Sequence, residues 1–205
     1  MIALLDYGAG NVRSVQKALE ESGGEVRLEK TPEGVAKADA VVLPGVGAFD
    51  DCINAMQRQE LLSASKEFIK TGQPFLGICV GYQALFEKSE EFNSCAAGLG
   101  IFGGNVVQFQ KKGIKVPQIG WNQIEINQPD CPILQGIDPG SYFYFVHSFF
   151  PKPTNDSVIA TRTTYGETFA SAVWRDNVFA TQFHPEKSQR MGLKLLANFV
   201  SITSS

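Results

Sequence analysis

Short apolar runs alternate with helical patterns along residues 1–78. The apolar runs are Ile2–Leu5, Val26–Leu28, Ala40–Leu43 and Gln73–Ile78. One helical pattern begins near Asn11 and stops at Ser22-Gly23-Gly24, and two more fill residues 49–70. Strands that alternate with helices in this way build a largely parallel sheet covered by helices on both faces. The sequence therefore predicts a doubly wound α/β fold.

The second half of the chain has a different pattern. Apolar and polar residues alternate in runs separated by Gly, Pro, Asn and Asp, at 105–109, 121–126, 142–150, 158–164 and 169–174. Such runs are typical of antiparallel strands, so an additional antiparallel region is expected. A strand at 178–183 and a helix carrying Met191, Leu195, Leu196 and Phe199 complete the pattern. Because no repeat or low-complexity linker separates the halves, we expect residues 1–205 to form one domain.

The composition argues against several classes of function. The net charge of −3 comes from scattered charges of both signs, without a basic run that could follow a phosphate backbone, so nucleic acid is not an expected partner. No stretch approaches the roughly 20 apolar residues that cross a bilayer, and no basic region of a secretion signal is found. The cysteines form no CxxC pair, so no metal, redox centre or cofactor is expected, and a reducing cytoplasm suits them.

Gly77-Ile78-Cys79-Val80-Gly81 places a nucleophile between two glycines, where an apolar strand should turn sharply into a helix over residues 80–89. Side chains at the flanking positions would clash in such a turn. Cys79 then lies beside the helix N-terminus, where N–H groups and the dipole favour the thiolate. The same amides, starting with that of Val80, can stabilise an oxyanion. The alternative is a buried cysteine between incidental glycines.

The other three cysteines lack this setting. We expect Cys52 in the core of its helix, and Cys95 and Cys131 in loops or at strand edges.

His184 and Glu186 supply the remaining parts of an acyl-transfer site. A cysteine nucleophile needs a base, and histidine serves near neutral pH. His184 follows an apolar strand, and Glu186 lies two residues further on, where it can orient the imidazole. Pro185 stiffens the intervening turn. His147 lies in a strand of aromatic residues, which favours a core or pocket-wall position. A glycine loop after an early strand, Pro44-Gly45-Val46-Gly47, can join these groups beyond the carboxyl ends of the strands.

Six motifs, taken in order, point to a known family. They are Asp6-Tyr7-Gly8-Ala9-Gly10-Asn11, Pro44-Gly45-Val46-Gly47, Gly77-Ile78-Cys79-Val80-Gly81-Tyr82-Gln83, Gly120-Trp121-Asn122, Tyr144-Phe145-Val146-His147-Ser148 and Gln182-Phe183-His184-Pro185-Glu186-Lys187-Ser188. Over nearly its whole length the sequence resembles class I, triad-type glutamine amidotransferases. Within that group it most resembles the glutaminase subunits of imidazole glycerol phosphate synthases, which serve histidine biosynthesis.

The resemblance implies a reaction and the residues for it. Cys79 would attack the side-chain amide of glutamine, with His184 and Glu186 completing the triad, and a glutamyl thioester would be hydrolysed to glutamate. Ammonia would be the useful product. Family members hold glutamine with the loop that here contains Gly45, Val46 and Gly47, with the region of Gln83, and with backbone near His147 and Ser148.

The resemblance also implies a protein partner. In the family, ammonia passes to a separate (βα)8-barrel cyclase subunit of a heterodimer, which makes imidazole glycerol phosphate and aminoimidazole carboxamide ribotide. Asn11, Trp121, Tyr144 and Lys187 match family positions at or near that interface. Without the family, Trp121 and Tyr144 would be taken for core aromatics, Lys187 for a solvated charge and Asn11 for a helix cap.

Glutaminase activity in this family is low until the partner binds, which is attributed to rearrangement of an oxyanion loop. We hypothesise that Pro44-Gly45-Val46-Gly47 carries this switch, because its glycines permit a peptide to reorient. The sequence departs from the family pattern at Phe149 and in a somewhat long segment, 127–140, both expected away from the triad.

Three alternatives remain open. The chain could serve another synthase, such as one making anthranilate, aminodeoxychorismate or pyridoxal phosphate, although Asp6–Asn11, Gly120-Trp121-Asn122 and the PGVG loop argue against this. It could be a catalytically idle scaffold with the same fold, which the intact triad disfavours. It could also be a stand-alone cysteine hydrolase that acts on another amide, and strong glutaminase turnover without a partner would favour this alternative.

Overall fold

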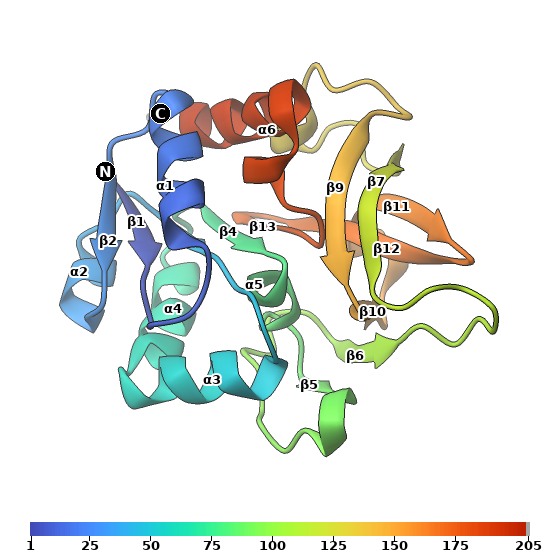
Figure 1. Ribbon diagram of the computed structural model, residues 1–205. Helices are drawn as coiled ribbons and strands as arrows, with labels where there is room; N and C mark the ends of the chain where they lie inside the picture. Colours follow the sequence, from blue (N-terminus) through green and yellow to red (C-terminus); the bar gives the residue numbers. More distant parts are fainter. Residues whose placement is uncertain (204–205) are drawn as a thin grey trace.

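The computed structural model describes residues 1–203, and an eight-stranded mixed sheet runs through its centre (Figure 1). The strand order is β2-β1-β3-β4-β13-β12-β11-β8. The parallel part consists of β1 (Ile2–Leu5), β2 (Val26–Glu29), β3 (Ala40–Leu43), β4 (Phe75–Ile78) and β13 (Val178–Thr181). The antiparallel part consists of β12 (Glu167–Arg175), β11 (Ile159–Tyr165) and β8 (Glu125–Ile126). The predicted α/β class with an added antiparallel region is confirmed.

Helices cover both faces of the parallel part (Figure 1). On one face, α1 (Val12–Glu21) packs against α6 (Gln189–Ile202). On the other face, α4 (Leu61–Lys70) packs against α2 (Pro32–Ala36) and α3 (Phe49–Arg58). The helices form because apolar residues recur at helical spacing, as in Val15, Ala18 and Leu19 of α1, which are buried. The sequence analysis did not foresee α2, whose start is marked by the Thr31 side chain accepting a hydrogen bond from the Gly34 amide.

Two smaller sheets complete the second half. One has the order β10-β6-β5, with β10 (Phe149–Pro153), β6 (Gly104–Gln108) and β5 (Lys88–Ser89), and the other pairs β7 (Gln118–Gln123) with β9 (Tyr142–His147). The predicted run 142–150 is therefore two strands in different sheets, separated at Ser148. The run 121–126 is likewise divided between β7 and β8. Short 3-10 turns are η1 (Glu91–Asn93), η2 (Pro132–Leu134), η3 (Asp156–Val158) and η4 (Pro185–Lys187).

The predicted helix over residues 80–89 is wrong beyond its first turn. The observed α5 spans Val80–Gln83, after which the chain turns and enters β5. The carbonyl of Ala84 accepts from the Leu99 amide, and that of Leu85 accepts from the amides of Ile101 and Phe102. These carbonyls therefore serve a neighbouring segment and do not continue the helix. Because every residue from 80 to 86 is buried, no apolar stripe distinguished one helical turn from three.

A single hydrophobic cluster joins the two halves of the chain. It includes Leu4 and Val42 from the first half together with Phe145, Phe169 and Phe199 from the second. The single domain that we propose for the chain rests on this shared core. Among the described residues, no helix is both long and apolar enough to cross a membrane.

Candidate active site

Three adjacent parallel strands carry the predicted site at their carboxyl ends. β4 pairs with β3 on one side and with β13 on the other. Pro44–Gly47 follows β3, Cys79 follows β4, and His184 comes three residues after β13. Gly47 and Cys79 are 32 positions apart in sequence, and Cys79 and His184 are 105 positions apart. The fold brings these segments together because their strands are neighbours in the sheet.

Cys79 has the strained backbone that the glycine spacing predicts. Its φ and ψ are 56° and −109°, which a residue with a side chain adopts rarely. A Cβ on Gly81 would lie 2.0 Å from the Leu43 carbonyl oxygen, and one on Gly77 would lie 2.7 Å from the Gly81 carbonyl oxygen. The Cys79 amide also donates to the Thr181 carbonyl at 2.8 Å. Close backbone packing therefore holds the nucleophile in this turn.

The loop Pro44–Gly47 lies directly against this turn. A Cβ on Gly45 would meet the Gly81 nitrogen at 2.6 Å and the Val80 Cβ at 2.8 Å, so the loop and the nucleophile turn touch through backbone. Gly47 differs, because its φ is +89° and a Cβ there would meet no atom within 4 Å. Glycine is thus needed at position 45 because a side chain would clash with the nucleophile turn, and at position 47 because the backbone has a positive φ.

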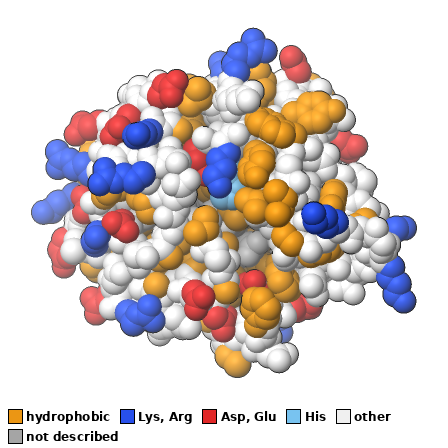
Figure 2. Space-filling model, viewed as in Figure 1, with side chains coloured by type: hydrophobic (Ala, Val, Ile, Leu, Met, Phe, Trp, Pro, Cys, Tyr) orange, Lys and Arg blue, Asp and Glu red, His pale blue; other side chains and the backbone are white. Residues whose placement is uncertain are grey.

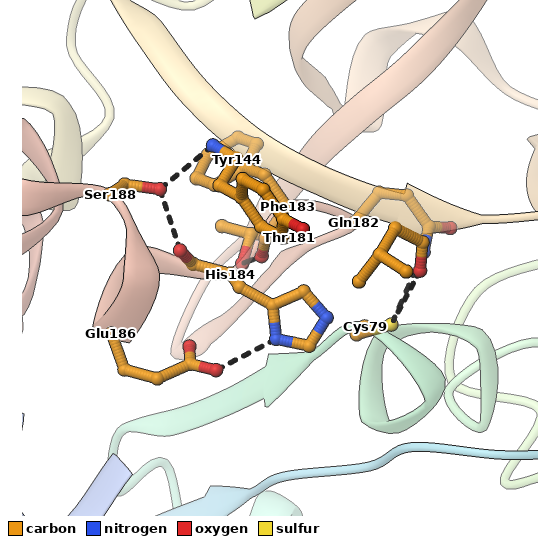
Figure 3. A network of polar contacts seen from close by, with 9 residues as sticks. Cys79, Tyr144, Thr181, Gln182, Phe183, His184, Glu186 and Ser188 are labelled. Atoms are coloured by element: carbon orange, nitrogen blue, oxygen red, sulfur yellow. Dashed lines mark hydrogen bonds and ion pairs between the residues drawn. The ribbon is translucent and has the colours of Figure 1, made fainter. Parts of the chain in front are cut away.

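His184 connects the nucleophile to the buried carboxylate (Figure 3). Its Nδ1 lies 2.8 Å from Oε1 of Glu186, and both side chains are at most 2% exposed. Its Nε2 faces Cys79 and has no nitrogen or oxygen partner among residues 1–203. Burial alone would lower the pKa of His184, but the charge and hydrogen bonding of Cys79, and then of Glu186, outweigh it and raise the pKa to about 10. The arrangement therefore favours a protonated imidazole facing Cys79.

Ser188 fixes the backbone that carries His184, a contact that the sequence analysis missed. The Ser188 hydroxyl donates to the His184 carbonyl at 2.6 Å and accepts from the Tyr144 amide at 2.9 Å (Figure 3). The His184 amide in turn donates to the Tyr144 carbonyl at 2.9 Å. These bonds join the turn η4 to strand β9. In the sequence, the only indication of this role was that Ser188 belongs to the same motif as His184.

A pocket of about 390 Å³ opens onto the sulfur of Cys79. Its walls include most of the residues that the sequence analysis assigned to catalysis and substrate binding, namely Val46, Gly47, Cys79, Val80, Gln83, His147, Ser148 and His184. Gly45 and Glu186 do not line it, whereas Lys187, which was matched to the partner interface, does. The pocket walls also contain Glu91, Pro117, Val146 and Phe149, which the sequence analysis did not assign. A larger hollow of about 520 Å³, beside β6 and β10, contains none of the three triad residues.

Glu91 is the one carboxylate among the described residues that line this pocket. Its Oε2 accepts from the Phe49 amide at 2.8 Å, at the start of α3. Burial raises the pKa of Glu91, and the Phe49 amide opposes that rise. In the sequence Glu91 follows Glu90 in a polar stretch that resembles a solvated surface. Its position depends on a helix start 42 residues earlier, so local pattern could not reveal it.

His147 occupies the pocket wall, one of the two positions expected for it. Its Nδ1 lies 2.9 Å from the Phe149 carbonyl oxygen, and its Nε2 lies 3.0 Å from Oε1 of Gln118. Burial lowers the pKa of His147 to about 4. The hydrogen bond to Phe149 opposes this shift, and the nearby charge of His184 adds to it. A neutral ring donates from only one nitrogen, so a flip of the Gln118 amide, which presents N–H to Nε2, satisfies both sides.

The residues matched to a partner interface are partly gathered on one surface. Trp121 is 45% exposed on β7 and packs edge-on against Tyr144 of β9, with ring centroids 6.0 Å apart. The Lys187 Nζ lies 5.9 Å from the Tyr144 ring centroid. Ile119 and Tyr142 are also exposed on these strands. Figure 2 shows hydrophobic side chains gathered over this part of the molecule, beside a histidine.

The alternative for Trp121 is therefore wrong, and the alternative for Asn11 holds for its position but not for a side-chain cap. Trp121 is not a core aromatic, because almost half of its surface is exposed. Asn11 precedes α1 at the N-cap position, but its exposed side chain makes no capping hydrogen bond.

The other cysteines lie where their setting indicated. Cys52 is buried in α3, Cys95 is exposed, and Cys131 is buried before η2, and all four described cysteines are free thiols.

Comparison with known proteins agrees with this fold. The profile of the family described as glutamine amidotransferase class-I matches residues 3–202. A glutamine amidotransferase structure superposes with a TM-score of 0.77 at 16% identity, covering 100% of this chain and 99% of that one. The PurLQS structure from Thermotoga maritima gives a TM-score of 0.78 at 18% identity, covering 98% and 97%. At these identities the structures support the fold alone. The chain belongs to the class-I glutamine amidotransferase family.

Closer relatives narrow this assignment. The imidazole glycerol phosphate synthase subunit HisH of Syntrophotalea carbinolica is 51% identical, with 97% of this chain and 98% of that protein covered. The protein of the same name from Acinetobacter baylyi is 48% identical, with 97% of each covered. That from Rhodopirellula baltica is 46% identical, with 98% and 97% covered. Within the family, the chain is thus similar over nearly its full length to HisH subunits.

Proposed function

We propose that the chain is the glutaminase subunit of an imidazole glycerol phosphate synthase in histidine biosynthesis. It hydrolyses glutamine to glutamate and ammonia and passes the ammonia to a separate cyclase subunit. The observation that carries this proposal is the buried line from Cys79 through His184 to Glu186, which opens into a pocket of about 390 Å³. Relatives named HisH support the particular synthase.

The first half of the reaction makes ammonia. The Cys79 thiolate attacks the carbon of the glutamine side-chain amide, and the carbonyl oxygen becomes an oxyanion. The amide of Val80 and the loop Gly45–Gly47 are the proposed donors to that oxyanion. As the sulfur loses its charge to the new bond, the attraction that raised the pKa of His184 weakens. His184 then gives its proton to the leaving nitrogen, and ammonia departs from a glutamyl thioester.

The second half regenerates the site. Neutral His184 takes a proton from water at Nε2, and the resulting hydroxide attacks the thioester carbon. The carbon–sulfur bond breaks, and the sulfur leaves as a thiolate beside the imidazolium. The new carboxylic acid gives its proton to the solvent and becomes glutamate. Glu186 holds Nδ1 at 2.8 Å throughout, so the same ring nitrogen faces the sulfur in both halves.

The charges around the pocket suit a free amino acid. Glutamine carries an ammonium and a carboxylate on its α-carbon. Glu91 offers a carboxylate on the pocket wall for the ammonium, and Lys187 offers an ammonium at the same pocket. Gln83, His147 and Ser148 line the same pocket, as the resemblance to the family implies.

The proposed partner is a (βα)8-barrel cyclase subunit, forming a heterodimer with this chain. Support comes from the exposed rings of Trp121 and Tyr142 and the half-buried Tyr144 between them and the pocket, which β9 reaches at Val146 and His147. Ammonia released at Cys79 would have a short path to a protein seated there. A reducing cytoplasm, the proposed location, would keep Cys79 reduced.

The test is glutamate release from glutamine by the purified chain, alone and with a cyclase subunit and its nucleotide ligand. A Cys79→Ala variant is the control. We expect low activity that rises steeply with the partner and is absent in the control. Strong turnover without a partner would favour a stand-alone hydrolase, and activation by a different synthase would reassign the partner. Absence of glutamate release under every condition would refute the proposal.

A further inference from the structure

Gln182 is a buried amide that faces the nucleophile. It directly follows β13, is fully buried, and its backbone amide donates to the Ser171 carbonyl at 2.8 Å. Its side-chain Nε2 lies 3.8 Å from Sγ of Cys79 (Figure 3). Nothing in the mechanism above uses this group, and an amide so completely buried needs a reason to be there.

A chain of donors fixes which end of the Gln182 amide faces the sulfur. The Phe149 carbonyl can only accept, and it takes a hydrogen from Nε2 of Gln83 at 3.0 Å. The same Nε2 donates its other hydrogen to Oε1 of Gln182 at 3.3 Å. If the Gln182 amide were reversed, two NH₂ groups would face each other. Its N–H must therefore face Cys79.

The sulfur has one neighbour that favours the thiol and one that favours the thiolate. The Val146 carbonyl oxygen lies 4.0 Å from Sγ, where it can accept a hydrogen from a thiol but would repel an anion. The Gln182 N–H is instead a donor, 3.8 Å from Sγ, and a donor interacts more strongly with a thiolate than with a thiol. Because α5 has only four residues, its dipole is weaker than that of the longer helix expected from the sequence. A specific donor to the sulfur therefore carries more of the stabilisation.

We infer that Gln182 is a further catalytic residue, whose side-chain N–H stabilises the Cys79 thiolate, and that Gln83 acts as a positioning residue by holding the Gln182 amide in that orientation. The inference rests on the proposed function for the role of Cys79 as nucleophile. The two residues add to the triad a chain of hydrogen bonds that runs from the Phe149 carbonyl through Gln83 and Gln182 to the reacting sulfur.

The test compares Gln182→Glu with Gln182→Met. Glutamate keeps the shape and the acceptor for Gln83 but presents no N–H to the sulfur when ionised. Methionine removes both hydrogen bonds. Gln135→Met is the matched control, because Gln135 donates to the carbonyls of Pro129 and Cys131 away from the pocket. All chains carry Cys95→Ser, since Cys95 is the exposed thiol that would otherwise react.

The first measurement is the rate of Cys79 alkylation by iodoacetamide as a function of pH. Loss of a hydrogen bond to a charged group should lower the rate at neutral pH by roughly tenfold in both Gln182 variants and move the midpoint of the profile to higher pH. Gln135→Met should match the parent. Should Gln182→Met fail to fold, the near-isosteric Gln182→Glu alone decides. Profiles of the folded Gln182 variants that superimpose on the parent would overturn the inference.

Turnover separates this inference from the proposed function. In the complex with the cyclase subunit, kcat for glutamine should fall by about tenfold in Gln182→Glu while KM changes little, because Gln182 does not line the pocket. A rise in KM with kcat unchanged would indicate a structural role and overturn the inference. Because alkylation requires no glutamine, it tests the contact with the sulfur even if glutaminase turnover is absent.

Discussion

The phenolic hydroxyl of Tyr7 donates to the carbonyl oxygen of Pro44 at 2.8 Å and so ties the loop after β1 to the loop after β3. Sγ of Cys52 lies 3.4 Å from the same hydroxyl, and the Gln59 side chain donates to the Tyr7 carbonyl at 3.0 Å. Burial raises the pKa of Tyr7, so the group stays a phenol and keeps its donor. The start of the loop Pro44–Gly47 is therefore anchored, and its freedom lies further on, at Gly47.

We expect Tyr7→Phe to reduce the free energy of unfolding by about 1 to 3 kcal/mol, because the Pro44 carbonyl is left buried without this partner. Urea unfolding measures the loss. Tyr165→Phe is the matched control, since it removes a phenol bond of the same length to the Lys115 carbonyl at an exposed position. Its effect should be smaller, and equal losses in the two variants would contradict the prediction.

Gly47→Ala should keep the fold but lose most of the activation by the cyclase subunit. The substitution is strained at a φ of +89° and costs about 1 kcal/mol, with no steric contact to add to it. Glutamate release with and without partner measures the effect. Gly23→Ala is the control, because Gly23 has a φ of +91°, equal space around it, and a position after α1 away from the pocket. Full activation in Gly47→Ala would refute the switch hypothesis.

The imidazolium of His184 should persist well above pH 6.5 and depend on Cys79. Its raised pKa of about 10 derives in large part from Cys79. A group with a raised pKa stabilises the fold fully below its unfolded pKa and loses that contribution as pH rises through the folded value. NMR of the ring nitrogens should show the pKa falling in Cys79→Ala, where burial is opposed by Glu186 alone. An unchanged titration would show that the thiolate is not the cause.

His147 should make the protein less stable as pH falls from about 6.5 toward about 4, because the unfolded chain binds a proton that the buried ring does not. The loss for this group is on the order of 3 kcal/mol when integrated over that window. Chemical unfolding as a function of pH, compared between the parent and His147→Asn, measures it. The variant should show a shallower decline over this range. Parallel curves would place the pH dependence in other groups.

Trp121→Ala should weaken activation by the cyclase subunit while leaving unfolding nearly unchanged. The side chain is 45% exposed and packs mainly against Tyr144, so it contributes more to a docking surface than to the core. A titration with the cyclase subunit should require at least about tenfold more partner for half-maximal glutamate release. Trp121→Phe, which keeps an aromatic ring against Tyr144, should retain more affinity. Unchanged titrations in both variants would exclude Trp121 from the interface.

The parts of this molecule that could be predicted from sequence are those with a local cause. Cys79 could be placed because flanking glycines and a preceding apolar strand lie within a few residues of it. His184 could be placed for the same reason, at the end of another apolar run. The helix after Cys79 was overpredicted because its residues are buried on all sides and carry no periodic signal. Whether a carbonyl accepts a hydrogen bond within the helix or from a distant segment depends on the tertiary structure.

The parts that could not be predicted depend on which strands become neighbours. Nothing local indicates that β13 lies beside β4, yet this pairing brings Gln182 to Cys79 and completes the site. Glu91 reaches the pocket because its carboxylate accepts from the Phe49 amide. Ser188 gained its role from a contact with the Tyr144 amide.

The backbone contacts of Gly77 and Gly81 constrain how this sequence can drift over evolutionary time. A Cβ on Gly81 would fall 2.0 Å from the Leu43 carbonyl, an obstacle that exists whether or not the chain still hydrolyses anything. A lineage that lost the reaction could replace Cys79, His184 and Glu186, yet it would still need Gly77 to close the turn after β4 and Gly81 to pack that turn against the end of β3. The two glycines therefore indicate a shared fold and ancestry. Only Cys79, His184 and Glu186 indicate whether selection for ammonia release continues.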